Sequence, residues 1–145
     1  YEAAHAAALW SQRADLGLTD RVTFAGEVAP EALDRLYASA TLFALATRYE
    51  GYGMVFAEAL VRGLPIVATR TGAVPDTVPA GTGLLAPPGE PEAVARALRT
   101  LLTDAIERAR LTEAARLAGE RLPRWEETAT LAGEVLNALA QARAR

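Results

Sequence analysis

The sequence predicts an α/β protein in which an open parallel sheet is flanked by helices and followed by a helical C-terminal tail. Two observations carry this prediction. Strand and helix patterns alternate between residues 21 and 88 with short links, and two of the strands are continuous apolar runs. After Pro88 only helical patterns follow. Such alternation is typical of a parallel sheet with helices packed on it.

The first elements follow from local signals. A helix is expected from Glu2 to Leu16, stopped by Gly17, and RVTFAG (21–26) is expected to form a short strand. The segment 29–40 has apolar residues at helical spacing. TLFALAT (41–47) is apolar almost throughout, which favours a strand buried on both faces.

The next elements continue the alternation. Residues 49–53 form a glycine-broken loop, and a helix from Met54 to Arg62 ends at Gly63. A second strand buried on both faces is expected over 64–69, and a short last strand over 84–88 follows turn-rich sequence at 72–83. The tail should hold three helices, over 90–104, 105–122 and 124–142.

Composition excludes several classes of site. The chain of 145 residues has 51% hydrophobic residues and a net charge of −3, which disfavours a nucleic-acid partner. All 15 basic residues are arginine, so lysine chemistry such as a Schiff base is absent. With no cysteine and one histidine, neither a thiolate site nor a histidine-rich metal site can form.

The length fits one domain over residues 1–145, with an α/β part over 1–88 and a helical tail over 89–145. No apolar run is long enough to span a membrane and no secretion signal is evident, so a cytoplasmic location is expected. The chain opens without methionine inside a helical pattern. We therefore expect a fragment or an excised domain.

The segment RYEGYGMVFAEALVRG (48–63) is the candidate ligand site. It follows the carboxyl end of a predicted strand, which is where open α/β sheets bind ligands. Gly51 and Gly53 allow the backbone to approach a ligand closely. At the helix start, the N–H groups of Met54 and Val55 lack helical partners and favour a phosphate or diphosphate.

Two carboxylates flank this helix start. Glu58 lies one turn after Met54 on the same face, where it could accept hydrogen bonds from the vicinal hydroxyls of a ribose. Glu50 could meet the group attached beyond the phosphates. The spacing suggests a nucleotide sugar. From the spacing alone an alternative stays open, in which Glu58 pairs with Arg62 on a solvated face and Glu50 merely caps the first turn of the helix.

The stretch EGYGMVFAEAL (50–60) resembles the EGFG-x-x-x-x-EA signature of GT-B glycosyltransferases, specifically the retaining family 4. Further similar blocks occur in the same order and cover nearly the whole chain: DRVTFAGEV (20–28), EALVRGLPIVAT (58–69), TGAVPD (71–76), GTGLLAPPGEPEAVARALRTLL (81–102) and RWEETA (124–129). The resemblance implies a Rossmann-like fold, the C-terminal half of a GT-B protein truncated at its N-terminus.

The resemblance also implies residue roles. Glu50 would be the catalytic residue that contacts the donor sugar near the reacting carbon, and Glu58 would bind the ribose. The other donor-binding positions would be Gly51, Tyr52 and Gly53 in the sugar pocket, Met54 and Val55 at the diphosphate, Gly72 in a loop near the sugar, and Glu27 and Val28 beside the base.

The chain departs from the family pattern at a few places. Ala46 and Thr47 stand where the family often has Pro-Ser, and Ala73 and Asp76 replace the second Gly and the Glu of a Gly-Gly-x-Pro-Glu loop. In the family, two further strands precede the matching region, together with an Arg and a Lys whose charges neutralise the diphosphate. The acceptor-binding N-terminal domain is likewise outside this chain.

The resemblance implies a parent enzyme that transfers sugar from a nucleotide-diphosphate sugar to an acceptor hydroxyl with retention, without a metal or other cofactor. Charge-assisted contacts contribute about 1.5 to 3 kcal/mol each, so a chain lacking two cations should be inactive alone. Peripheral membrane association of the parent is left open. The rival interpretations are a nucleotide-sugar epimerase of GT-B architecture, a degenerate domain used for assembly and a flavodoxin-like signalling module.

Overall fold

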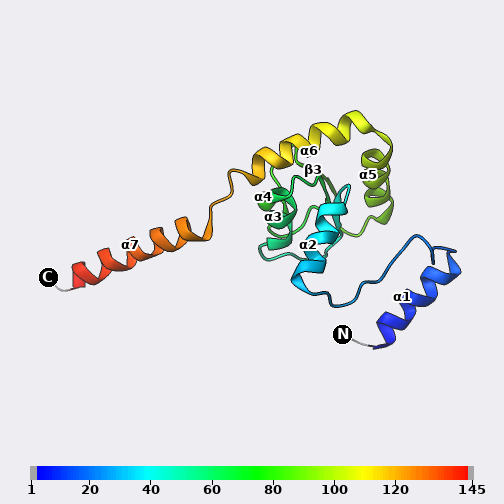
Figure 1. Ribbon diagram of the computed structural model, residues 1–145, viewed down its shortest axis with the longest axis horizontal. Coiled ribbons are helices and arrows are strands. Elements are labelled where there is room, and N and C mark those ends of the chain that lie inside the picture. The colour runs from blue at the N-terminus through cyan, green and yellow to red at the C-terminus, as the bar shows by residue number, and fades with distance from the viewer. Residues whose placement is uncertain (1–2, 144–145) are drawn as a thin grey trace. The chain divides into compact units, whose positions relative to one another are not determined.

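The computed structural model describes residues 3–143, and the chain divides into two compact units, residues 1–35 and 36–145 (Figure 1). The first unit contains α1 (Ala3–Asp15) and the start of α2 (Pro30–Ser39). Gly17 follows α1 with a φ of 63°, as the predicted helix stop requires. The predicted start at Glu2 lies outside the described residues. The organisation as one domain stays a prediction.

The predicted strand at 21–26 is wrong. These residues form no strand, because a strand needs a neighbouring chain to pair its N–H and C=O groups and none pairs with this segment within the first unit. The segment packs on α1 instead. The Phe24 ring meets Trp10 edge-on at 4.8 Å between centroids, and the Arg13 side chain donates to the Val22 carbonyl at 2.9 Å.

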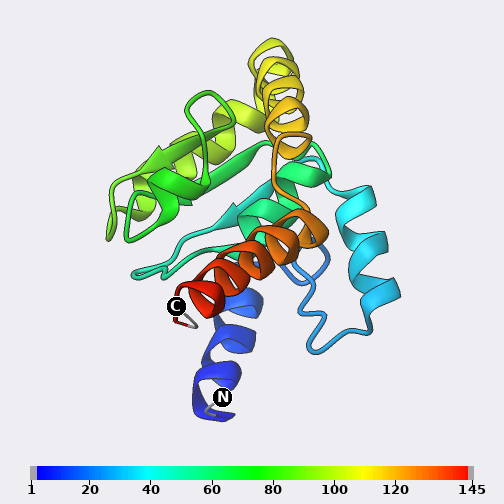
Figure 2. The same cartoon turned by 90° about the vertical axis from the view of Figure 1, so that its left-hand side faces the viewer.

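The second unit is built on a parallel sheet in the order β1 (Phe43–Leu45), β2 (Ile66–Thr69) and β3 (Gly83–Ala86). Ala44 is paired with Val67, and Val67 with Leu84. Figure 2 shows these strands side by side. The predicted open parallel sheet is therefore confirmed.

Helices cover the two faces of the sheet. On one face Ile66 and Ala68 share a buried cluster with Phe56 and Leu60 of α3 (Met54–Val61). On the other, Val67 packs with Leu101 of α5 (Pro91–Thr103) and with Leu111 of α6 (Ala105–Gly119). Every residue of β2 is buried, so the predicted burial of this strand on both faces is confirmed.

Burial on both faces is wrong for the strand predicted at 41–47. Only Phe43–Leu45 form β1, and Ala44 between them is exposed. The reason is that α5 packs on β2 and β3, which leaves the Ala44 side of this outer strand uncovered. Phe43 and Leu45 pack on the α3 side of the sheet, and Leu42, just before the strand, packs on the side of Leu101 and Leu111.

The helical tail is confirmed. It consists of α5, α6 and α7 (Trp125–Arg143), and the Asp104 carboxylate caps α6 by accepting from the N–H groups of Ile106 and Glu107 at 3.0 and 2.9 Å. The turn-rich segment 72–83 holds the one-turn helix α4 (Val74–Thr77). Among the described residues, no helix combines the length and the apolar character needed to cross a membrane.

Close packing of α6 on α3 depends on Gly119. A Cβ atom at this position would lie 2.3 Å from the Leu60 carbonyl oxygen and 2.8 Å from the Val61 Cα. Because those atoms belong to helix backbone, α6 could accommodate the methyl group only by moving away from α3. This contact between α6 and α3 therefore helps to fix the position of α3, the helix that carries the predicted ligand site.

We expect Gly119→Ala to lower the free energy of unfolding by about 1 to 3 kcal/mol, the typical cost of overpacking. Gly133→Ala is the matched control, because Gly133 lies within α7 and a methyl group at this position would meet no atom within 4 Å. Alanine there should not lower stability. Urea unfolding followed by circular dichroism compares the two, and equal effects would contradict the packing role.

Candidate functional site

The loops that follow β1 and β2 are joined by hydrogen bonds beyond the ends of the strands. Three of these bonds have ordinary lengths: Thr71 Oγ1 to the Arg48 carbonyl at 3.0 Å, the Ala73 N–H to the Glu50 carbonyl at 2.9 Å, and Thr77 Oγ1 to the Tyr52 carbonyl at 2.6 Å. The Thr69 hydroxyl also donates to the Thr47 carbonyl. The loop of the predicted site, which follows β1, is thus held in place by hydrogen bonds from the segment that follows β2.

Gly72 allows these two loops to approach each other. Its φ is 51°, and a Cβ atom there would lie 2.1 Å from the carbonyl oxygen of Glu50. A side chain would both strain the backbone and collide with a main-chain atom. Ala73, where the family has a second glycine, is accommodated and donates its N–H to the same carbonyl. Gly72 is therefore the position of closest approach.

The start of α3 has the form of an anion site. Gly53 is the N-cap residue with φ 83° and ψ 47°, and no side chain caps the helix. Within the described part of the chain, the N–H groups of Met54 and Val55 donate to no acceptor. The helix dipole adds about half a positive charge at this end. The alternative in which Glu50 caps the first turn is wrong.

Glu50 lies directly before the glycines of this loop and is half-buried. Its backbone is fixed by the bond from Ala73, whereas its carboxylate has no hydrogen bond or ion pair among residues 3–143. Gly51 and Tyr52 beside it are exposed, with the Tyr52 side chain 68% accessible. The carboxylate is therefore available to accept hydrogen bonds from a ligand.

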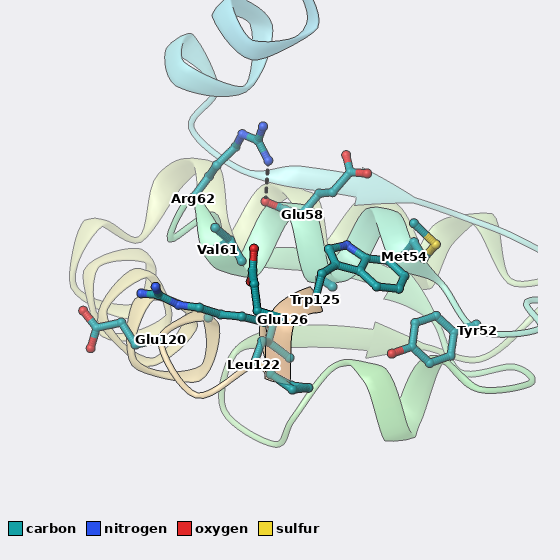
Figure 3. A pocket seen from close by; sticks show the side chains of 13 residues that line it. Tyr52, Met54, Glu58, Val61, Arg62, Glu120, Leu122, Trp125 and Glu126 are labelled. Atoms are coloured by element: carbon teal, nitrogen blue, oxygen red, sulfur yellow. Dashed lines mark hydrogen bonds between the residues drawn. The ribbon is translucent and has the colours of Figure 1, made fainter. Parts of the chain in front are cut away.

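Glu58 lies one turn into α3 and is held by a neighbouring tyrosine. The Tyr37 hydroxyl donates to Glu58 Oε2 at 3.2 Å. Arg62 donates to the backbone carbonyl of Glu58 at 3.1 Å (Figure 3) and stacks on the Tyr37 ring at 4.5 Å from its centroid. Arg62 thus contacts Glu58 through the backbone carbonyl of this residue, and it also packs on the ring of the tyrosine that donates to the Glu58 carboxylate.

The surroundings of Tyr37 raise the pKa of its hydroxyl above the ordinary value. Burial contributes most, followed by the negative charge of Glu58 and the hydrogen bond to it, while the charge of Arg62 acts in the opposite direction. The phenol therefore stays protonated through the neutral range. It remains a donor to the carboxylate.

A groove of about 640 Å³ runs beside α3 (Figure 3). Met54 and Glu58 line it, together with Tyr52 from the preceding loop. The opposite side comes from the segment after α6, which includes Arg124, and from the start of α7, where Trp125 is 77% exposed. The groove thus joins the helix start to Glu58, while Glu50 lies outside its lining.

The predicted residues fall into two groups. Glu27 and Val28 lie in the first unit, in the irregular segment before α2, with Glu27 exposed and Val28 half-buried. The remaining positions all belong to the second unit, at the start of α3 and the loops beside it: Glu50, Gly51, Tyr52, Gly53, Met54, Val55, Glu58 and Gly72. The structure brings this second group together.

Sequence reasoning missed two features of the site. Tyr37 lies in the segment 29–40, for which only a helix with apolar residues at helical spacing was expected, yet its hydroxyl reaches Glu58, 21 residues later in the chain. The threonines that join the loops also went unnoticed. The one local signal that could have identified Tyr37 is its polar hydroxyl on an otherwise apolar helix face, because a buried hydroxyl needs a hydrogen-bond partner.

Comparisons with known proteins agree with this geometry. D-inositol 3-phosphate glycosyltransferase of Corynebacterium urealyticum is 36% identical over 126 residues, which cover 86% of this chain and 30% of that protein. This chain therefore spans less than a third of that relative.

Solved structures show the same fold. Sucrose-phosphate synthase from Thermosynechococcus elongatus aligns with a TM-score of 0.84 and 32% identity over 96% of this chain and 35% of that one. Anabaena HepE in complex with UDP-glucose aligns with a TM-score of 0.80 and 28% identity over 97% and 38%. The second unit is thus a Rossmann-like α/β fold of the GT-B type.

The family described as "Glycosyl transferases group 1" matches residues 5–118, which is most of the chain. That span contains the loop, the helix start and both glutamates of the site. The chain belongs to the group 1 glycosyltransferase family.

Proposed function

We propose that this chain is the C-terminal, donor-binding domain of a retaining family 4 glycosyltransferase, which transfers sugar from a nucleotide-diphosphate sugar to an acceptor hydroxyl. One observation carries the proposal. The start of α3 has unpartnered N–H groups, and a carboxylate lies on each side of it, Glu50 before and Glu58 one turn after. A donor with hydroxyls on both sides of a diphosphate matches that order.

The diphosphate would lie at the N–H groups of Met54 and Val55. These donors point out of the first helical turn, and the dipole of α3 favours negative charge there. Gly53 is buried, and a Cβ atom there would lie 2.6 Å from the Phe56 ring, so glycine allows the loop to close onto the helix start in a left-handed conformation. The same donors would stabilise the leaving diphosphate as its charge develops, which is electrostatic preorganisation.

Glu58 would bind the ribose and Glu50 the sugar. Vicinal hydroxyls donate to a carboxylate, and each such charge-assisted bond is shorter and stronger than a neutral one. Glu50 would also stabilise the positive charge that the sugar ring develops as its bond to the diphosphate breaks. The acceptor hydroxyl attacks the same face from which the diphosphate leaves, so configuration is retained. Glu27 and Val28 would border the base.

The relatives support a nucleotide-sugar donor. One of the structures that share this fold holds UDP-glucose. The proposed chemistry needs no metal, because helix N–H groups and basic side chains neutralise the diphosphate. We place the acceptor-binding domain and those basic side chains outside this chain, in a cytoplasmic parent protein. The chain alone should then bind nucleotide weakly and show no turnover.

The first test is binding of nucleoside diphosphates to the chain. UDP, GDP and ADP are added at millimolar concentration, and amide chemical shifts are followed by NMR. We expect one of them to shift Met54 and Val55. Glu58→Ala should weaken that binding about tenfold to a hundredfold, since a bond to a charged group contributes about 1.5 to 3 kcal/mol.

Glu134→Ala is the control for this test, because it removes an exposed carboxylate from α7, away from the site. It should leave the affinity unchanged. An absence of shifts at α3 with all three nucleotides would contradict the proposed donor site. Equal weakening by both substitutions would show that the loss is not specific to Glu58 and would contradict its role in binding.

A second prediction concerns Glu50. Glu50→Gln should leave the affinity for the nucleoside diphosphate unchanged but reduce the additional affinity that an attached sugar provides, because only the sugar reaches this carboxylate. The ratio of the two dissociation constants, measured by NMR titration, reports the effect. A loss of affinity for the nucleoside diphosphate itself would place Glu50 at the phosphates instead.

A third prediction concerns Gly72. Gly72→Ala should cost more stability than Gly89→Ala, although both residues have left-handed φ values of 51° and 80°. Left-handed backbone costs about 1 to 2 kcal/mol for either alanine. Gly89 has open space around it, whereas Gly72 touches the Glu50 carbonyl. Thermal unfolding compares them, and only Gly72→Ala should also weaken binding of the nucleotide sugar.

A further inference from the structure

We propose that Tyr37 is a positioning residue that holds the Glu58 carboxylate in place to receive the ribose hydroxyls. The inference rests on the proposed function and deepens it. It assigns recognition of the ribose hydroxyls to a pair of residues, one from α2 and one from α3. Its basis is the hydrogen bond from the Tyr37 hydroxyl to Glu58 Oε2 at 3.2 Å.

The Tyr37 ring is fixed by its neighbours. It is only 8% exposed, and it stacks on Phe43 of β1 with 6.1 Å between centroids and an interplanar angle of 20°. Phe43 in turn meets Phe56 of α3 edge-on at 5.8 Å. Such aromatic contacts hold a ring in one orientation. The hydroxyl is therefore presented to α3 at a defined place.

Glu58 needs such support because it is long and half-exposed. A free glutamate side chain loses about 1.5 to 2 kcal/mol of rotamer entropy when a ligand orders it. A carboxylate whose Oε2 already accepts a hydrogen bond has lost much of that freedom before binding. The second oxygen, Oε1, accepts no hydrogen bond from the described residues and can receive a hydroxyl.

Arg62 completes the arrangement from the same face of α3. Its guanidinium covers the Tyr37 ring at 4.5 Å, and it donates to the Glu58 backbone carbonyl at 3.1 Å. A cation over an aromatic face is attracted to it. The tyrosine is thus packed between an aromatic cluster and an arginine. Of the two charged groups that face its hydroxyl end and its ring, Glu58 lies in α3 and Arg62 is the C-cap residue of that helix.

Tyr37→Phe tests the inference, because it keeps the ring and removes only the hydroxyl. The probes are the nucleoside diphosphate that binds best among UDP, GDP and ADP, and its 2′,3′-dideoxy counterpart. We expect the apparent Kd of the ribonucleotide to rise about threefold to tenfold, the effect of one hydrogen bond. The Kd of the dideoxy compound should not change, since it has no hydroxyls for Glu58 to bind.

Thr100→Val is the control: it also removes one hydroxyl, at an exposed threonine of α5 that does not line the groove, and should alter neither Kd. In the Glu58→Ala background, Tyr37→Phe should have no further effect on the ribonucleotide. Circular dichroism and the melting temperature verify that each variant folds.

Equal loss of both probes on Tyr37→Phe would show a merely structural role and overturn the inference, as would unchanged affinity for both. Failure of the proposed function is distinguishable from either result. In that case Glu58→Ala itself would leave ribonucleotide binding unchanged, or no nucleotide would bind at all.

Discussion

The site depends on one close approach between backbones, where the Ala73 N–H donates to the Glu50 carbonyl beside Gly72. This bond extends the pairing of β1 and β2 beyond the end of the sheet and fixes the position of Glu50. The loop from Gly51 to Gly53 is thereby held at both ends, between that bond and the start of α3. A rigid sheet edge can thus present a loop and a helix start with little freedom.

One helix, α3, contributes to the core and carries the proposed ligand site. The buried side of α3 packs on the sheet through Phe56 and Leu60, and α6 approaches it through Gly119. Its first turn and Glu58 remain open to a ligand. Because the buried face fixes the helix axis, the N–H groups and the carboxylate keep a constant spacing. The proposed binding of a diphosphate joined to a ribose depends on this constant spacing.

Much of the fold was predictable from the sequence because its signals are local. The apolar run that forms β2, the helix start at Met54 and the stop at Gly63 are all encoded by residues close together in the sequence. The strand expected at 21–26 fails because pairing requires a partner strand, which no local pattern supplies. Exposure of Ala44 was equally hidden, since it depends on which strands α5 covers.

The sequence by itself determined the order of the elements and the spacing of Glu50, the helix start and Glu58, because periodicity and chain position define these features. Only the tertiary structure decided that Gly72 contacts the Glu50 carbonyl and that Tyr37 reaches Glu58. Both contacts join segments about twenty residues apart, a distance over which neither helical nor strand periodicity determines which side chains meet. These contacts form because packing of the helices on the sheet brings the two segments of each contact together.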